Sequence, residues 1–239
     1  MRIGIIGYGK MGKEIEKIAL DRNHEISVII NRGDNIANLK GQVDVAIEFT
    51  QPEVAYHNIE WCINNEVPVV VGTTGWYSQF DNMVKECEAK QGAVFHATNF
   101  SVGVNILFHI NKQLARIMSK QPSYKAQLSE THHIHKKDSP SGTAITLAEQ
   151  FIANHDGYST WEETDSATVD NSVLPIIAYR ENEVPGIHEM KYESDIDMIA
   201  IKHSAKSRKG FAMGSVLAAE FLQGRQGVYN MEDLLNFNR

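Results

Sequence analysis

The chain has 239 residues, 42% of them hydrophobic, and a formal net charge of −7, which suits one large or two small domains with a substantial core. The mildly acidic charge argues against a nucleic-acid-binding surface, and the apolar runs are far too short to span a bilayer. The first residues lead directly into a strand pattern with no signal-peptide pattern, and Cys62 and Cys87 lie far apart in helix-like segments. We therefore expect a cytoplasmic protein with buried thiols rather than a disulfide framework.

The N-terminal segment has the pattern of a dinucleotide-binding unit. A short apolar strand at 3–7 leads into G-Y-G-K-M-G, and a helical pattern and a second strand at 26–30 follow. This is the context that the G-x-G-x-x-G fingerprint requires, where the first glycine permits the tight turn, the second lets the pyrophosphate approach and the third lets the helix pack on the strand. The alternative is a glycine-rich turn in another kind of α/β protein. The fingerprint predicts cofactor binding by Gly7, Tyr8, Gly9, Lys10, Met11 and Gly12.

The second strand ends in Asn31 and Arg32, where an NAD-preferring protein usually has an acidic residue for the ribose hydroxyls. Asn31 cannot supply that charge, and the guanidinium of Arg32 can bind a 2′-phosphate or stack on adenine. We therefore expect NADPH to bind at least as well as NADH, and use of both cofactors is compatible with the sequence. The alternative is that Arg32 is a surface residue of a polar loop.

Strands and helices continue to alternate up to residue 103. Further strands are predicted at 43–49, 67–71 and 93–96, with helices from Pro52 to about 64 and from about 78 to 90. The loops G-T-T-G at 72–75 and A-T-N-F-S at 97–101 follow two of these strands. Because open α/β sheets bind ligands at the carboxyl ends of their strands, these loops are predicted to open onto one crevice.

The pattern changes near residue 104. A helix with Leu107, Ile110, Leu114 and Ile117 on one apolar face is predicted first, then a strand at 124–133 and a helix at 143–154. A polar segment at 154–172 is expected to be an exposed excursion. Strands at 174–179, 187–193 and 197–204 predict an antiparallel or mixed sheet, and helices at about 210–222 and after residue 230 end the chain.

These elements predict an α/β fold with two domains. The first is an N-terminal Rossmann-type dinucleotide-binding domain at 1–103. The second is a C-terminal α+β domain with a mixed sheet at 104–211, which carries the histidine and lysine segment.

Residues 130–143, E-T-H-H-I-H-K-K-D-S-P-S-G-T, join the strand at 124–133 to the next helix. Backbone N–H groups at the helix start, the helix dipole and nearby ammonium groups predict a site for a carboxylate. An imidazole beside it can transfer protons near neutral pH. The alternatives are a solvated basic loop and a zinc site at His133 and His135. No cysteine or second histidine pair lies at ligand spacing, and adjacent lysines repel a cation, so no metal is predicted.

Six separated stretches carry a family resemblance. They are G-Y-G-K-M-G at 7–12, V-G-T-T-G at 71–75, A-T-N-F-S-V-G-V-N at 97–105, E-T-H-H-I-H-K-K-D-S-P-S-G-T-A at 130–144, V-P-G-I-H at 184–188 and I-K-H-S-A-K-S-R-K-G-F-A-M-G at 201–214. Together they resemble the 4-hydroxy-tetrahydrodipicolinate reductase (dihydrodipicolinate reductase) family of lysine biosynthesis, over nearly the whole chain. The chain departs from the family at Thr131 and Ser139, which replace residues that are more often alanine, and at 179–182, where Y-R-E-N replaces a glycine-rich stretch.

The resemblance implies an NAD(P)H-dependent reduction of a cyclic unsaturated imine dicarboxylate to tetrahydrodipicolinate, in diaminopimelate and lysine biosynthesis. It implies that His132 is a proton donor and acceptor and Lys136 a proton donor to the substrate, and which of the two delivers the proton stays open. It also implies that the second domain binds the substrate and forms a homotetramer through its sheet, and that the C-terminal helices at 212–239 complete the first domain. Substrate contacts are implied for His133, Ser141, Gly142 and Thr143. Contacts to the nicotinamide side are implied for Gly72, Thr73, Thr74, Ala97, Thr98, Asn99 and Phe100.

Two other functions remain possible for a chain with this first domain. One is a related two-domain dehydrogenase of an open-chain amino acid, such as aspartate dehydrogenase. The other is a non-catalytic NAD(P)-sensing protein, which needs neither His132 nor Lys136. The compact S-G-T anion site beside several cations favours the cyclic dicarboxylate.

Overall fold

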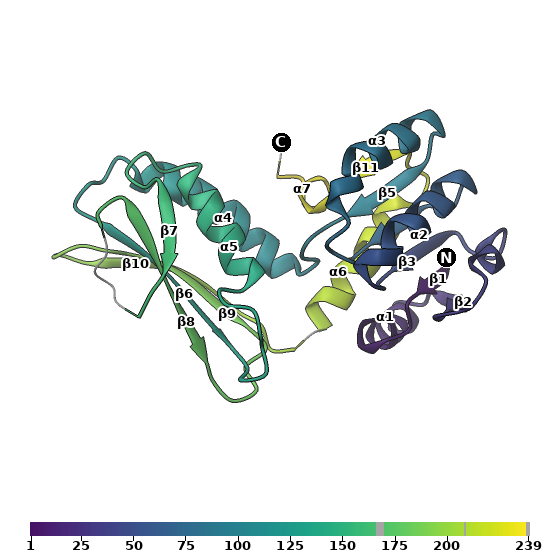
Figure 1. Ribbon diagram of the computed structural model, residues 1–239, viewed down its shortest axis with the longest axis horizontal. Coiled ribbons are helices and arrows are strands. Elements are labelled where there is room, and N and C mark those ends of the chain that lie inside the picture. The colour runs from purple at the N-terminus through teal and green to yellow at the C-terminus, as the bar shows by residue number, and fades with distance from the viewer. Residues whose placement is uncertain (166–169, 208, 238–239) are drawn as a thin grey trace. The chain divides into compact units, whose positions relative to one another are not determined.

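The computed structural model describes residues 1–165, 170–207 and 209–237 (Figure 1). The chain divides into two compact units. Unit 1 comprises Met1–Val102 and Lys209–Arg239, and unit 2 comprises Gly103–Arg208. Unit 1 is built on a parallel sheet and unit 2 on a mixed sheet, so the predicted fold class is confirmed.

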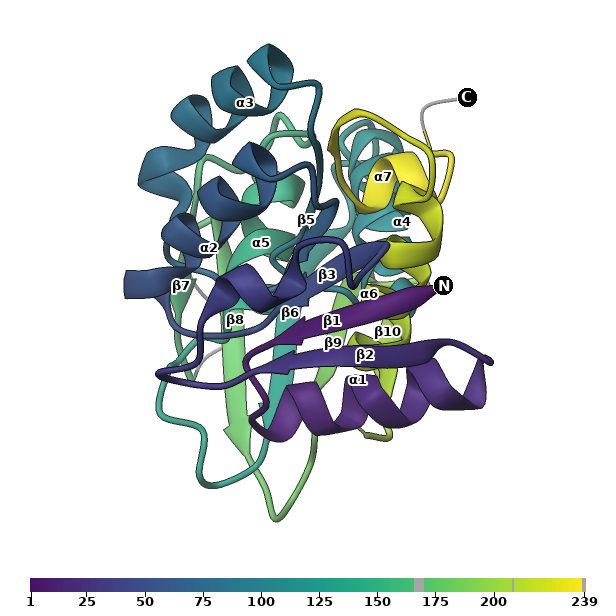
Figure 2. The same cartoon turned by 90° about the vertical axis from the view of Figure 1, so that its right-hand side faces the viewer.

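Within the described residues, unit 1 contains a six-stranded sheet whose paired strands are all parallel. The strand order β11-β5-β4-β3-β1-β2 reverses beside β1, which lies between β2 and β3 (Figure 2). Ligands of open α/β sheets bind at such a reversal, outside the carboxyl ends of the strands. The strands are β1 (Arg2–Ile6), β2 (Glu25–Ile30), β3 (Val45–Glu48), β4 (Val69–Val71), β5 (Ala93–His96) and β11 (Gly227–Tyr229).

Helices cover both faces of this sheet. The helices α1 (Lys10–Asp21) and α6 (Lys209–Leu222) pack on one face against alternate strand residues such as Ile5 and Val70. On the other face, α2 (Pro52–Asn64) and α3 (Phe80–Ala89) pack against the intervening residues, such as Val71. Both faces of the sheet are therefore buried, which explains the continuous apolar runs of its strands. The short elements are η1 (Ile36–Leu39), η2 (Tyr77–Gln79) and α7 (Met231–Leu234).

The two cysteines belong to the core of unit 1. Cys62 and Cys87 are buried free thiols, as predicted. Burial raises the pKa of each thiol, so neither is a reactive thiolate at neutral pH. None of the helices in the described part of the chain is long and apolar enough to cross a membrane.

Unit 2 is a five-stranded sheet, within its described residues, in the order β10-β9-β6-β8-β7. The central strand β6 is parallel to β8 and antiparallel to β9, β10 is antiparallel to β9, and β7 is parallel to β8. The helices α4 and α5 pack on one face, over core residues such as Leu128 and Met190. The elements are α4 (Val102–Met118), β6 (Lys125–His132), α5 (Gly142–Ile152), β7 (Thr160–Glu163), β8 (Val173–Arg180), β9 (Ile187–Glu193) and β10 (Met198–Ser204).

The predicted apolar face of α4 is correct at Leu107 and Leu114, which pack in the core of unit 2, and wrong at the other two positions. Ile110 and Ile117 are 43% and 61% exposed, whereas the buried positions include Asn111 and Ala115. Asn111 lies between α4 and α5 and donates a hydrogen bond from Nδ2 to the carbonyl of Leu147 at 2.9 Å. Apolar residues occur around most of this helix, so their periodicity does not select the face that the tertiary packing uses.

The polar segment at 154–172 is also more structured than expected. It contains the strand β7, which pairs with β8 and packs Trp161 against the core of unit 2. Residues 166–169 of this segment lie outside the described residues. A four-residue edge strand with a single large apolar side chain has too little periodicity to be recognised in the sequence.

Candidate active site

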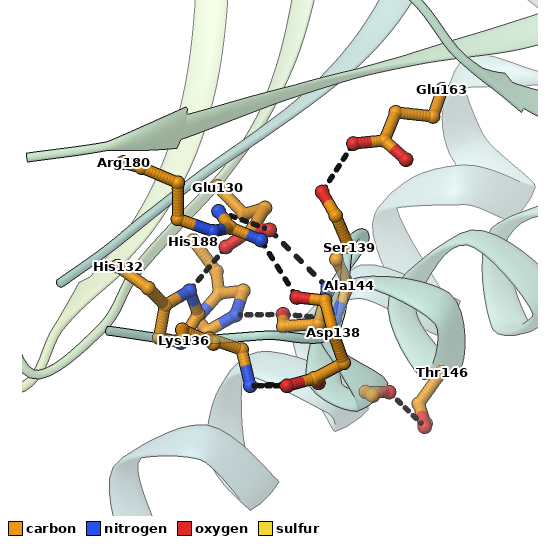
Figure 3. Close-up of polar contacts among 12 residues, drawn as sticks. Glu130, His132, Lys136, Asp138, Ser139, Ala144, Thr146, Glu163, Arg180 and His188 are labelled. Carbon is orange, nitrogen blue, oxygen red and sulfur yellow. Dashed lines mark hydrogen bonds and ion pairs between the residues drawn. The ribbon is translucent and has the colours of Figure 1, made fainter. Parts of the chain in front are cut away.

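Strand register places four ionisable side chains together at one end of the sheet of unit 2. On β6, Glu130 and His132 belong to the buried set that alternates along the strand. Glu130 lies opposite His188 of β9, and His132 lies opposite Arg180 of β8. Figure 3 shows the four side chains meeting beside the start of α5.

The carboxylate of Glu130 is at the centre of this group and is only 1% exposed. Its Oε2 is hydrogen-bonded to Nδ1 of His132, and its Oε1 accepts hydrogen bonds from Nη1 of Arg180 at 3.0 Å and from the backbone N–H of Ser141 at 3.2 Å. Burial raises the pKa of Glu130, but the hydrogen bonds and charges of His132 and Arg180 outweigh burial and bring the pKa below its ordinary value. Glu130 is therefore an ionised carboxylate at neutral pH.

Ser141 and His188 connect this group to α5. Ser141 is the N-cap of the helix, where its Oγ accepts a hydrogen bond from the backbone N–H of Ala144 at 3.2 Å. The same Oγ lies 3.0 Å from Nε2 of His188, whose ring meets the ring of His132 edge to face with centroids 5.1 Å apart. Burial and the neighbouring His132 lower the pKa of His188 to about 3, so its imidazole is neutral at neutral pH.

We expect His188 to make the folded protein less stable in mild acid. Its pKa is about 3 in the folded protein and ordinarily 6.5, so between these values the unfolded chain binds a proton that the folded chain does not. The free energy of unfolding therefore falls as the pH drops through that window. In His188→Gln this fall should be shallower, because the ring that titrates has been removed. Urea unfolding of both proteins at about pH 7 and about pH 5 measures the two slopes, and equal slopes would contradict this expectation.

The loop that carries Lys136 is tied to the same network. Lys136 donates from Nζ to both carboxylate oxygens of Asp138, at 2.9 and 2.8 Å. This hydrogen bond holds the pKa of Asp138 below its usual range. Arg180 donates from Nη2 to the carbonyl of Asp138 at 2.8 Å, so one guanidinium contacts both Glu130 and the loop.

Of the residues predicted to bind the substrate, Ser141, Gly142 and Thr143 form the start of α5, and His133 directly follows β6. A Cβ added to Gly142 would meet no atom within 4 Å, so an anion has room to approach the backbone there. The ring atom Nδ1 of His133 is buried and has no hydrogen-bond partner among the described residues. Ser141 differs, because Glu130 binds its N–H and its Oγ caps the helix. Ser141 therefore stabilises the start of α5 through contacts within the protein.

The ligand atoms of Glu130, His132 and His188 lie within 4.8 Å of one another, a spacing that a metal ion could use. The chemistry of the group opposes a cation. The guanidinium of Arg180 is bonded to the same carboxylate at 3.0 Å, and Nε2 of His188 faces the hydroxyl of Ser141. A divalent ion would have to displace or repel these groups, so the arrangement favours proton transfer over metal binding.

The glycines of the fingerprint meet three different requirements at the carboxyl end of β1. Gly7 has a φ of +95°, and a Cβ there would lie 2.1 Å from the carbonyl oxygen of Phe49. A Cβ on Gly12 would lie 2.4 Å from the carbonyl oxygen of Gly7, so α1 packs closely on its own loop. Gly9 has open space around it and is an N-cap without a side-chain hydrogen bond. Backbone N–H groups at the start of α1 can therefore receive a pyrophosphate.

Two cavities adjoin this loop and share Gly9, Phe49 and Thr50 among their walls. The larger, about 770 Å³, reaches the end of β2, and the smaller, about 420 Å³, reaches the end of β4. The two cavities thus extend from the glycine loop toward the ends of two different strands. Predicted cofactor residues that line them are Gly7, Tyr8, Gly9, Lys10, Met11, Asn31, Arg32, Gly72, Thr73 and Thr74.

The loop at 97–100 does not line either cavity. Ala97 and Phe100 are 7% and 2% exposed and belong to the core beneath α1 and α6. The ring of Phe100 packs against the rings of Phe49 and Phe95, with centroids 5.9 Å apart in each case. Any contact that these two residues make with a cofactor must therefore come from the backbone.

An acidic residue of the larger cavity was not predicted from the sequence. Asp34 lines the larger cavity, and its Oδ2 accepts a hydrogen bond from the backbone N–H of Asn31 at 2.7 Å. In the dinucleotide-binding motif the acidic residue lies at the end of the second strand, where this chain has Asn31. The turn after β2 brings a carboxylate to the same cavity from three residues further along the chain.

Comparison with known proteins agrees with this geometry. The family model for the N-terminus of dihydrodipicolinate reductase matches residues 1–100, and the model for its C-terminus matches residues 103–235. The 4-hydroxy-tetrahydrodipicolinate reductase of Christiangramia forsetii is 42% identical over 239 residues, which covers 99% of this chain and 98% of that protein. The enzyme of the same name from Neisseria gonorrhoeae is 33% identical over 231 residues, which covers 93% of this chain and 84% of that protein.

A solved structure shares the fold. Dipicolinate-bound dihydrodipicolinate reductase from Paenisporosarcina sp. TG-14 matches with a TM-score of 0.78 at 20% identity, over 96% of this chain and 97% of that one. The resemblance seen in the sequence is thus confirmed in both halves of the chain. The chain belongs to the dihydrodipicolinate reductase family and is an oxidoreductase that uses a nicotinamide dinucleotide.

Proposed function

We propose that the protein reduces 4-hydroxy-tetrahydrodipicolinate (dihydrodipicolinate) to tetrahydrodipicolinate with NADPH or NADH, in diaminopimelate and lysine biosynthesis. The observation that carries this proposal is the histidine and lysine loop of residues 132–137. Its first residue, His132, is paired with the buried Glu130, and the loop leads to an accessible helix start at Gly142. The names of the relatives supply the substrate, and this loop supplies the groups that its reduction needs.

In unit 2, we assign proton transfer to His132 and Lys136. A carboxylate of the substrate would lie at the start of α5, bound by Gly142 and Thr143, with His133 beside it. Positive charge from Lys136 and the helix dipole both favour a dianionic substrate there. Ser141 would keep the helix start in place through its cap and its contact with Glu130.

In unit 1, we assign the pyrophosphate to the loop from Gly7 to Gly12 and the first turn of α1. The adenosine side would occupy the larger cavity, near Asn31 and Arg32, and the nicotinamide side would lie near Gly72, Thr73 and Thr74. The loop of Ala97, Thr98, Asn99 and Phe100 would contribute through its backbone. When bound, the nicotinamide supplies the hydride.

An activity assay tests this proposal. Condensation of aspartate semialdehyde with pyruvate yields the cyclic substrate, and its addition should start the oxidation of NADPH or NADH. Activity only with an open-chain amino acid would point to a dehydrogenase of the aspartate type. Cofactor binding without turnover of either substrate would point to a sensing protein.

We expect NADPH to support at least as high a kcat/KM as NADH, because Asn31 brings no charge against the 2′-phosphate and Arg32 lines the same cavity. Asn31→Asp should shift the preference toward NADH, by accepting from the ribose hydroxyls and repelling the phosphate. The shift should be roughly tenfold or more, the scale of one hydrogen bond to a charged group. Steady-state rates with both cofactors measure this shift. Asp34→Asn, which removes a negative charge from the same cavity, is the opposite change of charge. Strict use of NADH by the wild type would refute this expectation.

We further propose that the protein is a cytoplasmic homotetramer, assembled through the sheet of unit 2. Tyr179 of β8 and Met198 of β10 are 45% and 54% exposed, and the strand register places both on the face of the sheet that α4 and α5 do not cover. Light scattering on the purified chain measures the assembly. A monomer at micromolar concentration would refute the proposal.

A further inference from the structure

We propose that Glu130 is a positioning residue for proton transfer: its carboxylate holds the proton of His132 on Nδ1, and Gly186 keeps the opposite ring nitrogen, Nε2, open for exchange. The role in turnover rests on the proposed function. The position of the proton is a property of the protein alone and can be measured without a substrate.

The contacts of Glu130 determine which nitrogen carries the proton. Its Oε1 faces two groups that can only donate, the guanidinium of Arg180 and the backbone N–H of Ser141. Its Oε2 faces Nδ1 of His132. Two donors and a lowered pKa keep this carboxyl ionised, so it can only accept. Nδ1 of His132 must then donate, and in the neutral ring the lone pair lies on Nε2.

The backbone on the other side of the ring leaves Nε2 accessible. Gly186 has a φ of +151°, and a Cβ built on it would lie 2.9 Å from Nε2 of His132. That is closer than a carbon can normally approach, so any side chain at this position would cover the nitrogen or push the ring away. The segment 184–188, V-P-G-I-H, therefore comes close to Nε2 of His132 at Gly186, its one residue without a side chain.

The neighbouring histidine does not compete for this role. Nε2 of His188 is hydrogen-bonded with the hydroxyl of Ser141, and the pKa of about 3 keeps the ring of His188 neutral. Its ring contacts His132 edge to face. His188 thus packs the ring of His132 without adding a charge beside it.

A purely structural role for Glu130 is the competing explanation, since the buried Glu130 and the partly exposed Arg180 form an ion pair at 3.0 Å. The two roles differ in what each variant changes. Glu130→Gln keeps the shape of the side chain but offers either an oxygen or an NH₂ group to Nδ1, so the tautomer is no longer imposed. Arg180→Gln removes the ion pair but keeps the carboxylate on His132.

Nitrogen-15 NMR of the full-length protein labelled at histidine measures the tautomer directly. The spectrum is recorded at about pH 8.5, where an ordinary imidazole is neutral, and His132→Gln assigns the signal. We expect the Nδ1–H form in the wild type and in Arg180→Gln, and a mixed or Nε2–H form in Glu130→Gln. An Nε2–H form in the wild type, or an equal change in both variants, would overturn the proposal. The wild-type spectrum decides even if Glu130→Gln does not fold.

Kinetics test the consequence for turnover. Glu130→Gln should lower kcat by about 10²-fold, within the range for lost general acid–base catalysis, with little change in the KM of the cyclic substrate or the Kd of NADPH. Gly186→Ala should also lower kcat, whereas Gly41→Ala, which has a φ of +71° and no atom within 4 Å of its Cβ, should not. Wild-type kcat in Glu130→Gln would overturn the positioning role. A wild type without reductase activity would instead refute the proposed function and leave the NMR result standing.

Discussion

His132→Gln and Lys136→Met are each expected to lower kcat by about 10²–10⁴-fold, the usual effect of losing a general acid or base. The physical reason differs between the two. His132 is a buried ring bonded to an ionised carboxylate, so it can take up and release a proton in a fixed orientation. Lys136 carries an ammonium group that Asp138 holds in the loop leading to α5. Steady-state rates with saturating NADPH and the cyclic substrate measure both effects.

Neighbours in the same loop provide matched controls. His135 and Lys137 are exposed, and His135 faces Glu183 at 3.2 Å. His135→Gln and Lys137→Met change the same residue types within a few positions and should leave kcat close to that of the wild type. Turnover like that of the wild type in both His132→Gln and Lys136→Met would refute the assignment of proton transfer to these residues.

Thr143→Val is expected to raise the KM of the cyclic substrate by roughly tenfold to a hundredfold, the cost of one hydrogen bond to a charged group. Thr143 lies in the first turn of α5, where its hydroxyl would add to the backbone N–H groups available to the proposed carboxylate. The Kd of NADPH should stay nearly unchanged, because Thr143 belongs to unit 2 and the proposed cofactor site to unit 1. Pyridine-2,6-dicarboxylate, a planar dicarboxylate, should inhibit the wild type competitively and the variant poorly.

Thr146→Val separates loss of the anion contact from damage to the helix. Thr146 lies almost one turn further along α5 and donates from Oγ1 to the carbonyl of Gly142 at 3.0 Å (Figure 3). Its replacement perturbs the same turn without removing the hydroxyl of Thr143, so KM should change little. Equal inhibition of the wild type and Thr143→Val, or a parallel loss of NADPH binding, would place the anion site elsewhere.

The elements of unit 1 were predictable because their signals are local. The strand, glycine loop and helix around Gly7, Gly9 and Gly12 are adjacent in sequence, and each glycine meets a steric requirement that shows in the motif. The strand β11 was missed, since Gly227–Tyr229 is too short to show periodicity and pairs with β5, a distant part of the chain. The burial of Phe100 was also missed, because its partner Phe49 follows β3, far from it in the chain, and packs against it only once β3, β4 and β5 pair.

In unit 2, His132, Lys136 and the start of α5 were found from one continuous stretch. Glu130, Arg180 and His188 were missed, because strand register brings them together from three strands. One signal was present in the sequence. Glu130 and His132 are two residues apart on a predicted strand, so they share a face and can bond to each other. Arg180 and His188 could be added only once the pairing of β8 and β9 with β6 was known.

Transfer of deuterium from the cofactor to the product tests the central claim most directly. NADPH labelled with deuterium at C4 of the nicotinamide, on the face that is transferred, is incubated with the protein and the fresh condensation product of aspartate semialdehyde and pyruvate. Mass spectrometry then measures the label in tetrahydrodipicolinate. The proposed function predicts one deuterium per molecule of product in the wild type, and a rate of labelling that falls with kcat in His132→Gln and Lys136→Met. Oxidation of the cofactor without deuterium in the cyclic product would contradict it.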